Sequence, residues 1–233
     1  MVAPPPTADV AKDDRDRSLL PLLFVLTVVT GLVDAVSYLK LGHVFVANMT
    51  GNVVFLGFAV AGAQDFSVSA SLAAIVAFLV GALAGGRLSS SMAEHRTRFF
   101  AIAILVKLVL VGAAFVVAMA MVDSDLARYL LIVLLAFAMG LQNATARSLA
   151  IPDLTTTVLT LTLTGLAADS KPAGGTNPRM GRRLLATGAM LFGAAIGAFL
   201  VLHVGVASAL ALTFTLLGLN AIAAYRAWSR SGG

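Results

Sequence analysis

The stretch GLVDAVSYLKLGHVFVANMTGNVVFLG, residues 31–57, places polar side chains inside apolar segments that are long enough to enter a lipid bilayer. Asp34 lies within the first of these segments. The second is interrupted by the polar residues Asn48, Thr50 and Asn52. Ionisable and polar groups are costly in hydrocarbon, so they usually face a cavity, a partner or a pathway rather than lipid. The stretch therefore predicts a membrane protein with a polar site at membrane depth.

The composition of the whole chain supports this interpretation. Hydrophobic residues make up 59% of the 233 residues, charged residues 12%, and the mean hydropathy is +0.96, whereas charged residues make up about 25% of a soluble domain. Six apolar runs are long enough to cross ~30 Å of hydrocarbon as helices. These six are 19–39, 68–88, 99–122, 127–147, 184–202 and 204–225, and two shorter runs are 44–63 and 152–168. The sequence predicts an all-α integral membrane protein.

The two short runs decide the topology. If they cross the membrane and the N-terminus is inside, ten Lys and Arg residues lie inside and five outside. If they are re-entrant and leave by the face they entered, thirteen lie inside and two outside, with Lys107 within a span. Because cytoplasmic segments carry an excess of basic residues, we favour six transmembrane helices plus two re-entrant half-helices, with both termini in the cytoplasm. Eight transmembrane segments are the alternative.

The sequence also suggests an internal duplication. Three short patterns of the first half recur in the same order in the second. They are GLVDA (31–35) and GLQNA (140–144), NMTGNV (48–53) and DLTTTV (153–158), and GALAG (81–85) and GAAIG (193–197). We therefore expect a single membrane domain of two repeats, 19–122 and 123–228, after a disordered cytoplasmic tail over 1–18. Three crossings per repeat give the two repeats opposite orientations, that is, an inverted repeat.

Inverted repeats place a binding site near the membrane midplane, at the interface between the repeats. The polar residues of the first two repeated patterns, in both halves of the chain, are therefore candidates for lining a substrate or ion pathway. They are Asp34, Asn48, Thr50, Asn52, Gln142, Asn143, Asp153, Thr155, Thr156 and Thr157. The alternative is structural: Asn48 and Asp153 cap half-helices that start near Thr50 and Thr155. Asp34 is then either a proton or cation site or an acceptor for backbone amides of the re-entrant turn.

Two further features have structural interpretations. Small residues allow helices to approach closely in a membrane, so we expect the glycines of the third pattern to pack the repeats together. These are Gly81, Gly85, Gly193 and Gly197. The side chain of Lys107 is long enough to reach the cytoplasmic interface from within its span, and the sequence favours that arrangement. Thr160, Thr162 and Thr164 alternate with leucines, but an isolated strand is not viable in a bilayer, so a short helix is expected there.

The core D-A-x-x-[YF]…G-x-V-F-x-A-N-M-T-G-N, here residues 34–52, closely resembles the DUF1275 (YoaK-like) family of bacterial integral membrane proteins. This resemblance implies a multi-pass protein of the bacterial inner membrane but no particular function. From the residues, we expect a small secondary transporter or channel-like permease for a small solute. The alternative is a non-transporting scaffold, sensor or assembly factor. We expect no enzyme activity, cofactor, metal or nucleic-acid partner; the lipid bilayer is the expected partner, and assembly of several copies is compatible with the sequence.

Overall fold

The computed structural model describes residues 8–92, 95–121, 124–149, 159–176 and 180–231. Within these ranges the chain is helical and contains no strand. The helices are α1 (Ala8–Lys40), α2 (Met49–Val60), α3 (Val68–Ser91), α4 (Arg96–Ala120), α5 (Asp125–Leu149), α6 (Leu159–Ala168), the 3₁₀ turn η1 (Lys171–Ala173), α7 (Met180–His203) and α8 (Val206–Ser231). The all-α class expected from composition is confirmed.

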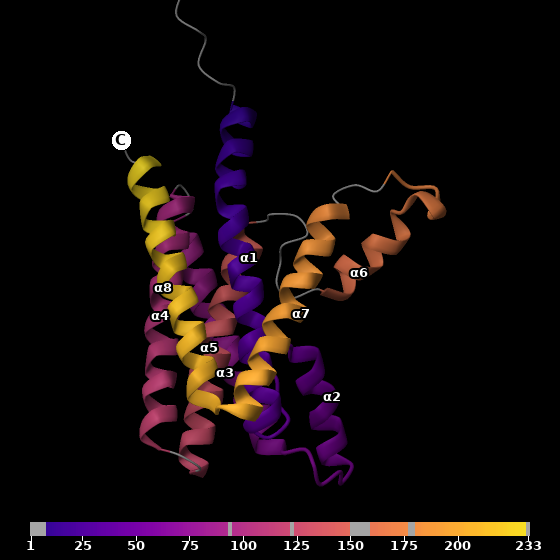
Figure 1. The fold of residues 1–233 in the computed structure, drawn as a ribbon, viewed down its shortest axis with the longest axis vertical. Coiled ribbons are helices and arrows are strands. Elements are labelled where there is room, and N and C mark those ends of the chain that lie inside the picture. Colours follow the sequence, from indigo (N-terminus) through magenta and orange to yellow (C-terminus); the bar gives the residue numbers. More distant parts are fainter. Residues whose placement is uncertain (1–7, 93–94, 122–123, 150–158, 177–179, 232–233) are drawn as a thin grey trace, which may run out of the picture.

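Six of these helices are long and apolar enough to span a bilayer: α1, α3, α4, α5, α7 and α8. They form an elongated bundle in which the described parts of both chain ends lie at the same end, drawn at the top of Figure 1. We call this the terminal end and the other the distal end. Helix α1 begins at Ala8, so it extends into residues 8–18, for which the sequence predicted a disordered tail.

Helix α2 does not cross the bundle. Its 12 residues span ~18 Å, about half of a bilayer. The segments before and after it meet at the distal end, where the ring Nδ1 of His43 lies 3.1 Å from the carbonyl oxygen of Asp65. The chain therefore returns to the end of the bundle from which this segment starts, and the re-entrant topology that the charge count favoured stays a prediction.

Helix α6 is the second short helix, and it lies toward the terminal end (Figure 1). The part of its apolar run at residues 152–158 lies outside the described residues. The guanidinium of Arg183 in α7 donates hydrogen bonds of 2.6 Å to the carbonyl of Gly165 and to the carboxylate of Asp169. These bonds hold the end of α6 beside the beginning of α7. The segment with Thr160, Thr162 and Thr164 forms α6 and is therefore helical, as expected.

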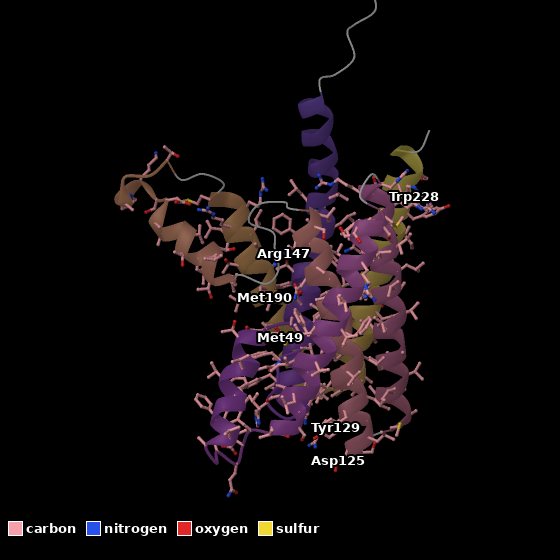
Figure 2. All side chains as sticks on the ribbon, turned by 180° about the vertical axis from the view of Figure 1, so that it is seen from behind. Met49, Asp125, Tyr129, Arg147, Met190 and Trp228 are labelled. Carbon is pink, nitrogen blue, oxygen red and sulfur yellow. The ribbon has the colours of Figure 1, made fainter. Side chains whose placement is uncertain are left out.

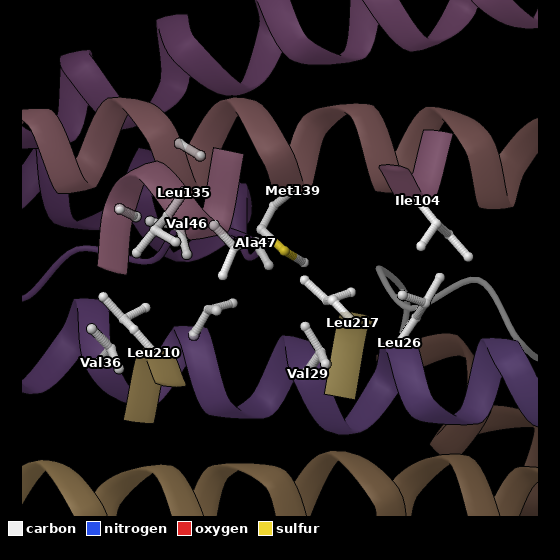
Figure 3. Packing of buried hydrophobic residues seen from close by; sticks show 14 of the residues in the cluster. Leu26, Val29, Val36, Val46, Ala47, Ile104, Leu135, Met139, Leu210 and Leu217 are labelled. Atoms are coloured by element: carbon white, nitrogen blue, oxygen red, sulfur yellow. The ribbon is translucent and has the colours of Figure 1, made fainter. Parts of the chain in front are cut away.

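The helices pack in a pattern that is the same for both halves of the chain. Helix α1 packs against α7 and α8, α5 packs against α3 and α4, and α4 packs against α8. Exchanging the first four helices with the last four leaves this set of neighbours unchanged. Figure 3 shows part of the apolar core, where Val46 and Ala47 of the re-entrant segment lie near Leu135 and Met139 of α5. The tip of the re-entrant segment is therefore buried inside the bundle.

Glycines form two close helix crossings. A Cβ added to Gly193 of α7 would lie 2.1 Å from the carbonyl oxygen of Val28 in α1, and one added to Gly81 of α3 would lie 2.1 Å from that of Phe137 in α5. The next glycine of each stripe, Gly197 or Gly85, meets the backbone one turn further along the same partner helix. At both crossings the backbones approach so closely that only glycine fits without a shift.

The partner helices contribute glycines to the same crossings. A Cβ on Gly31 of α1 would lie 2.4 Å from the carbonyl oxygen of Met190, and one on Gly140 of α5 would lie 2.0 Å from that of Phe78. Gly31 and Gly140 occupy equivalent positions in GLVDA and GLQNA. The sequence patterns that suggested a duplication therefore coincide with the contacts between α1 and α7 and between α3 and α5.

Candidate functional site

The re-entrant segment before α2 is held by the side chain of Asn52. The chain turns at Gly42, where φ is 95°, and then runs without regular structure to Asn48. The Oδ1 atom of Asn52 accepts a 2.8 Å hydrogen bond from the amide of Phe45, and its Nδ2 atom donates a 2.6 Å bond to the carbonyl of the same residue. Asn52 is fully buried. It supplies the pairing that extended backbone needs at membrane depth.

Asp34 holds the tip of the same segment. Its buried carboxylate accepts a 3.0 Å hydrogen bond from the amide of Ala47 and also receives one from the backbone of Val46. The bond joins the last two turns of α1 to a residue 13 positions later in the chain. This geometry is that of the second interpretation, in which Asp34 accepts backbone amides of the turn. The same contacts fix a carboxylate in the interior of the bundle.

Asn48 and Thr50 lie at the start of α2, one helix length (~18 Å) from the end of α2 at the distal end of the bundle. Asn48 occupies the N-cap position but makes no capping hydrogen bond. The expectation that Asn48 caps α2 is therefore wrong, because its backbone (φ −106°, ψ 83°) lies outside the extended conformation typical of N-caps. Both side chains are exposed at the surface of the bundle. Figure 2 shows the neighbouring Met49 at mid-height in the bundle.

The candidate residues in the second half of the chain are only partly described. Gln142 and Asn143 are buried in α5, and Asn143 is the counterpart of Asp34 in the repeated pattern. The other candidates from this half, Asp153, Thr155, Thr156 and Thr157, lie outside the described residues. The described part of the chain therefore joins Asp34 and Asn52 through the first re-entrant segment and places Gln142 and Asn143 on the facing half of the bundle.

A hydrogen-bonded chain crosses three helices in the interior. The Nζ atom of Lys107 in α4 donates to Oε1 of Gln142 in α5. The Nε2 atom of Gln142 donates a 2.9 Å bond to the hydroxyl of Thr30 in α1, which donates in turn to the carbonyl of Leu26 at 2.8 Å. We call Lys107, Gln142 and Thr30 the core polar chain. Of its members, the sequence had identified only Gln142 as a pathway candidate.

The position of Lys107 corrects an expectation from the sequence. Its side chain does not reach an interface: it is 1% exposed and lies eleven residues from the first residue of α4, or ~16 Å along the helix. In the described part of the chain no carboxylate forms an ion pair with it. The side chain of Lys107 turns inward because α4 presents this face to α5, which supplies an amide oxygen at the same depth. An ionisable side chain is costly to bury at this depth, which makes Lys107 a candidate functional residue.

One signal for Thr30 was present in the sequence. Thr27, Thr30, Asp34 and Ser37 follow each other at helical spacing, so they share one face of α1, and all four are buried. The structure shows that this face looks into the bundle, where Thr30 meets the side chain of Gln142. A small space of about 10 Å³ adjoins Lys107, Gln142 and Thr145, which is room for roughly one water molecule.

The distal end contains a much larger cavity, of about 380 Å³. It lies where α1, α4 and α7 end and where α5 and α8 begin, and we call it the distal vestibule. Its charged lining residues are Lys40 and Arg128, and no carboxylate lines it. Figure 2 shows the neighbouring Asp125 and Tyr129 at this end and Trp228 toward the terminal end. The vestibule was not foreseen, because its lining comes from three stretches that are distant in sequence, 40–41, 118–131 and 201–207.

Among the described residues, no cluster of three or more His, Asp or Glu side chains is arranged to hold a metal ion. The site consists instead of one carboxylate, one amine and several amides and hydroxyls inside a helical bundle. Such groups can hold a solute or an ion by hydrogen bonds and charge.

Comparison with known proteins gives a family for the chain. The family model "Protein of unknown function (DUF1275)" matches residues 22–223. The UPF0700 transmembrane protein YoaK of Bacillus subtilis (strain 168) is 36% identical over 154 residues, which cover 64% of this chain and 65% of that protein. The matched part of the chain thus spans somewhat less than two thirds of the length of the Bacillus subtilis protein. No solved structure matches the chain. The family match includes four of the six spans in full, most of the first and last spans, and the residues of the site, and the chain therefore belongs to the DUF1275 family of membrane proteins.

Proposed function

We propose that this protein is a small secondary transporter or channel-like permease for a small solute, without enzyme activity. The observation that carries the proposal is the core polar chain. Lys107, Gln142 and Thr30 bring an amine, an amide and a hydroxyl from three helices to one place in the interior. Intramembrane ionisable groups usually mark substrate, ion or proton pathways. Burying an ammonium without a carboxylate costs several kcal/mol, and packing of the bundle does not require it.

The repeat architecture supports the same proposal. The two glycine crossings join equivalent positions of the two halves, and Gly31 and Gly140 meet backbone carbonyls in the same way. We propose that residues 19–122 and 123–228 form an inverted repeat, with α2 entering from the distal face and α6 from the terminal face. Transporters built from inverted repeats place their sites at the repeat interface near the midplane. The core polar chain links α1, α4 and α5, which come from both proposed repeats.

The charge distribution supports an orientation. Of the described basic side chains outside the core, Lys40 and Arg128 line the distal vestibule. The others lie toward the terminal end, and examples are Arg87 near the end of α3, Arg96 at the start of α4 and Arg147 near the end of α5. By the positive-inside bias, we propose that the terminal end, with both termini, faces the cytoplasm of a bacterial inner membrane. The distal vestibule then opens to the outside.

An uptake screen in proteoliposomes tests the proposal. Purified protein is reconstituted, and radiolabelled neutral, anionic and cationic solutes are offered under imposed pH and voltage gradients. Uptake of at least one class above that of protein-free liposomes, and its loss in Lys107→Met, is the expected result. Lys107→Met keeps the length and volume of the side chain and removes its charge. Absence of uptake for every class under every gradient would refute the proposal.

One observation favours a second candidate, a non-transporting scaffold, sensor or assembly factor. The space beside Lys107, of about 10 Å³, admits no solute larger than water in this structure. A transporter must therefore have another state in which this space opens, whereas a scaffold needs no such state. If Lys107→Met supports no uptake but still captures partner proteins, that result would favour the scaffold.

A further inference from the structure

We propose that the solute of this protein is a small anion, which is met first in the distal vestibule by Lys40 and Arg128 and then held inside the bundle by Lys107. This inference rests on the proposed transport function, because it names the substrate class of the same site. It is based on the charges that line the two cavities. Three cationic side chains and no carboxylate line the distal vestibule and the space beside the core polar chain.

The vestibule has the size and the donors that a small anion requires. Its volume of about 380 Å³ falls within the ~300–1,000 Å³ range of small-molecule sites. The guanidinium of Arg128 uses one terminal nitrogen for Asp125 at 3.1 Å. Its Nε atom is buried and, among the described residues, has no hydrogen-bond partner. Asp125 is 87% exposed, so water screens its charge more than it screens the charges inside the cavity.

The helix ends around the vestibule do not reverse this charge. Two N-termini, of α5 and α8, and three C-termini, of α1, α4 and α7, surround it. Each end carries roughly half an elementary charge, so together they contribute roughly −0.5. The side chains of Lys40 and Arg128 contribute two positive charges. The vestibule is therefore net positive and concentrates anions at the distal face.

The core site continues the same preference. Lys107 donates to the neutral oxygen of Gln142, and no carboxylate in the described part of the chain compensates its charge. The carboxylate of Asp34 lies one turn of α1 beyond Thr30, and the backbone amides of the re-entrant segment occupy it. An anion beside Lys107 would supply the missing counter-charge and would receive hydrogen bonds from Thr30 or Gln142 after these exchange partners.

The two cavities are separated in this structure. Ala118 of the vestibule lies eleven residues from Lys107 along α4, or ~16 Å. The buried apolar residues Val111 and Ala114 lie between them. The structure is therefore a closed state, and an anion reaches Lys107 only when this apolar layer opens.

Anion uptake by the reconstituted full-length chain tests the inference. Radiolabelled acetate, phosphate and sulfate are compared with the neutral solutes glycerol and urea. We expect saturable uptake of at least one anion and none of the neutral solutes. Lys40→Gln or Arg128→Gln should raise the half-saturating concentration roughly 2- to 5-fold, as expected for partly exposed charges. Lys107→Met should lower uptake at least ~10-fold, because losing a hydrogen bond to a charged group weakens binding by about that factor.

The controls separate this inference from the proposed function. Arg87→Gln removes an exposed charge from the end of α3 that lies away from the vestibule and should leave half-saturation unchanged. Thermal protection of the purified protein by the same anions, which Lys40→Gln should weaken, gives a readout that does not need transport. Uptake of neutral solutes or cations alone would overturn the anion inference and leave transport standing. Anion protection without uptake of any solute would overturn transport and support the anion site, and absence of both would overturn both.

Discussion

Replacing Gly193 by alanine should destabilise the fold through a single methyl group. The new Cβ would lie 2.1 Å from the carbonyl oxygen of Val28, whereas ordinary contact begins at 3.4 Å. Helices α1 and α7 must therefore separate locally by about 1.3 Å, the difference between these two distances. Overpacking of this kind typically costs ~1–3 kcal/mol. In a domain of this size each kcal/mol lowers Tm by roughly 2–4 °C.

Gly188 provides the matched control within the same helix. A Cβ added there meets nothing within 4 Å, so Gly188→Ala should leave Tm unchanged or raise it slightly through better helix propensity. Thermal unfolding in detergent, followed by loss of the monodisperse species, compares the two variants. Gly81→Ala, with the equivalent clash in α3, should behave like Gly193→Ala. Equal stability of Gly193→Ala and Gly188→Ala would refute the close crossing of α1 and α7.

The remaining predictions concern the re-entrant segment. Asp34→Ala should cost ~1–3 kcal/mol, measured by thermal or denaturant unfolding, because it leaves the buried amide of Ala47 without its acceptor. Asp34→Asn keeps an acceptor oxygen and should fold normally; if Asp34 exchanges a proton during transport, uptake by this variant should lose its dependence on a pH gradient, and unchanged gradient-driven uptake would contradict that role. Asn52→Ala removes both bonds to the backbone of Phe45 and should destabilise the protein at least as much as Asp34→Ala. A wild-type Tm for Asn52→Ala would mean that the segment is held by apolar packing alone.

The features that the sequence predicted are those that depend on local pattern and on membrane physics. Apolar runs of sufficient length had to be helices, because an isolated strand cannot pair its backbone in lipid. The glycines Gly81 and Gly193 were recognisable because only small residues permit close helix crossings in a membrane. For the segment with Asn48 and Asn52, the count of basic residues favoured a re-entrant topology, because that topology leaves fewer of them outside.

The features that the sequence did not predict depend on how helices rotate against each other. The direction of the Lys107 side chain follows from the face that α4 turns toward α5, and the apolar run around Lys107 does not fix that face. Both interpretations of Asp34 were open because an aspartate can fill either role. It can accept a hydrogen bond from the amide of Ala47, or it can exchange a proton, and the sequence does not distinguish these roles. The distal vestibule depends on three-dimensional proximity of five elements and has no sequence signature.

The inverted arrangement of the two re-entrant segments is the central claim, and cysteine accessibility tests it most directly. The chain contains no cysteine, so Gln64→Cys, after α2, and Ala173→Cys, after α6, can each be made without background; both positions are exposed. Intact cells are treated with a membrane-impermeant maleimide before and after permeabilisation. We predict labelling of Gln64→Cys in intact cells and labelling of Ala173→Cys only after permeabilisation. Labelling of both variants from the same side would contradict the inverted arrangement.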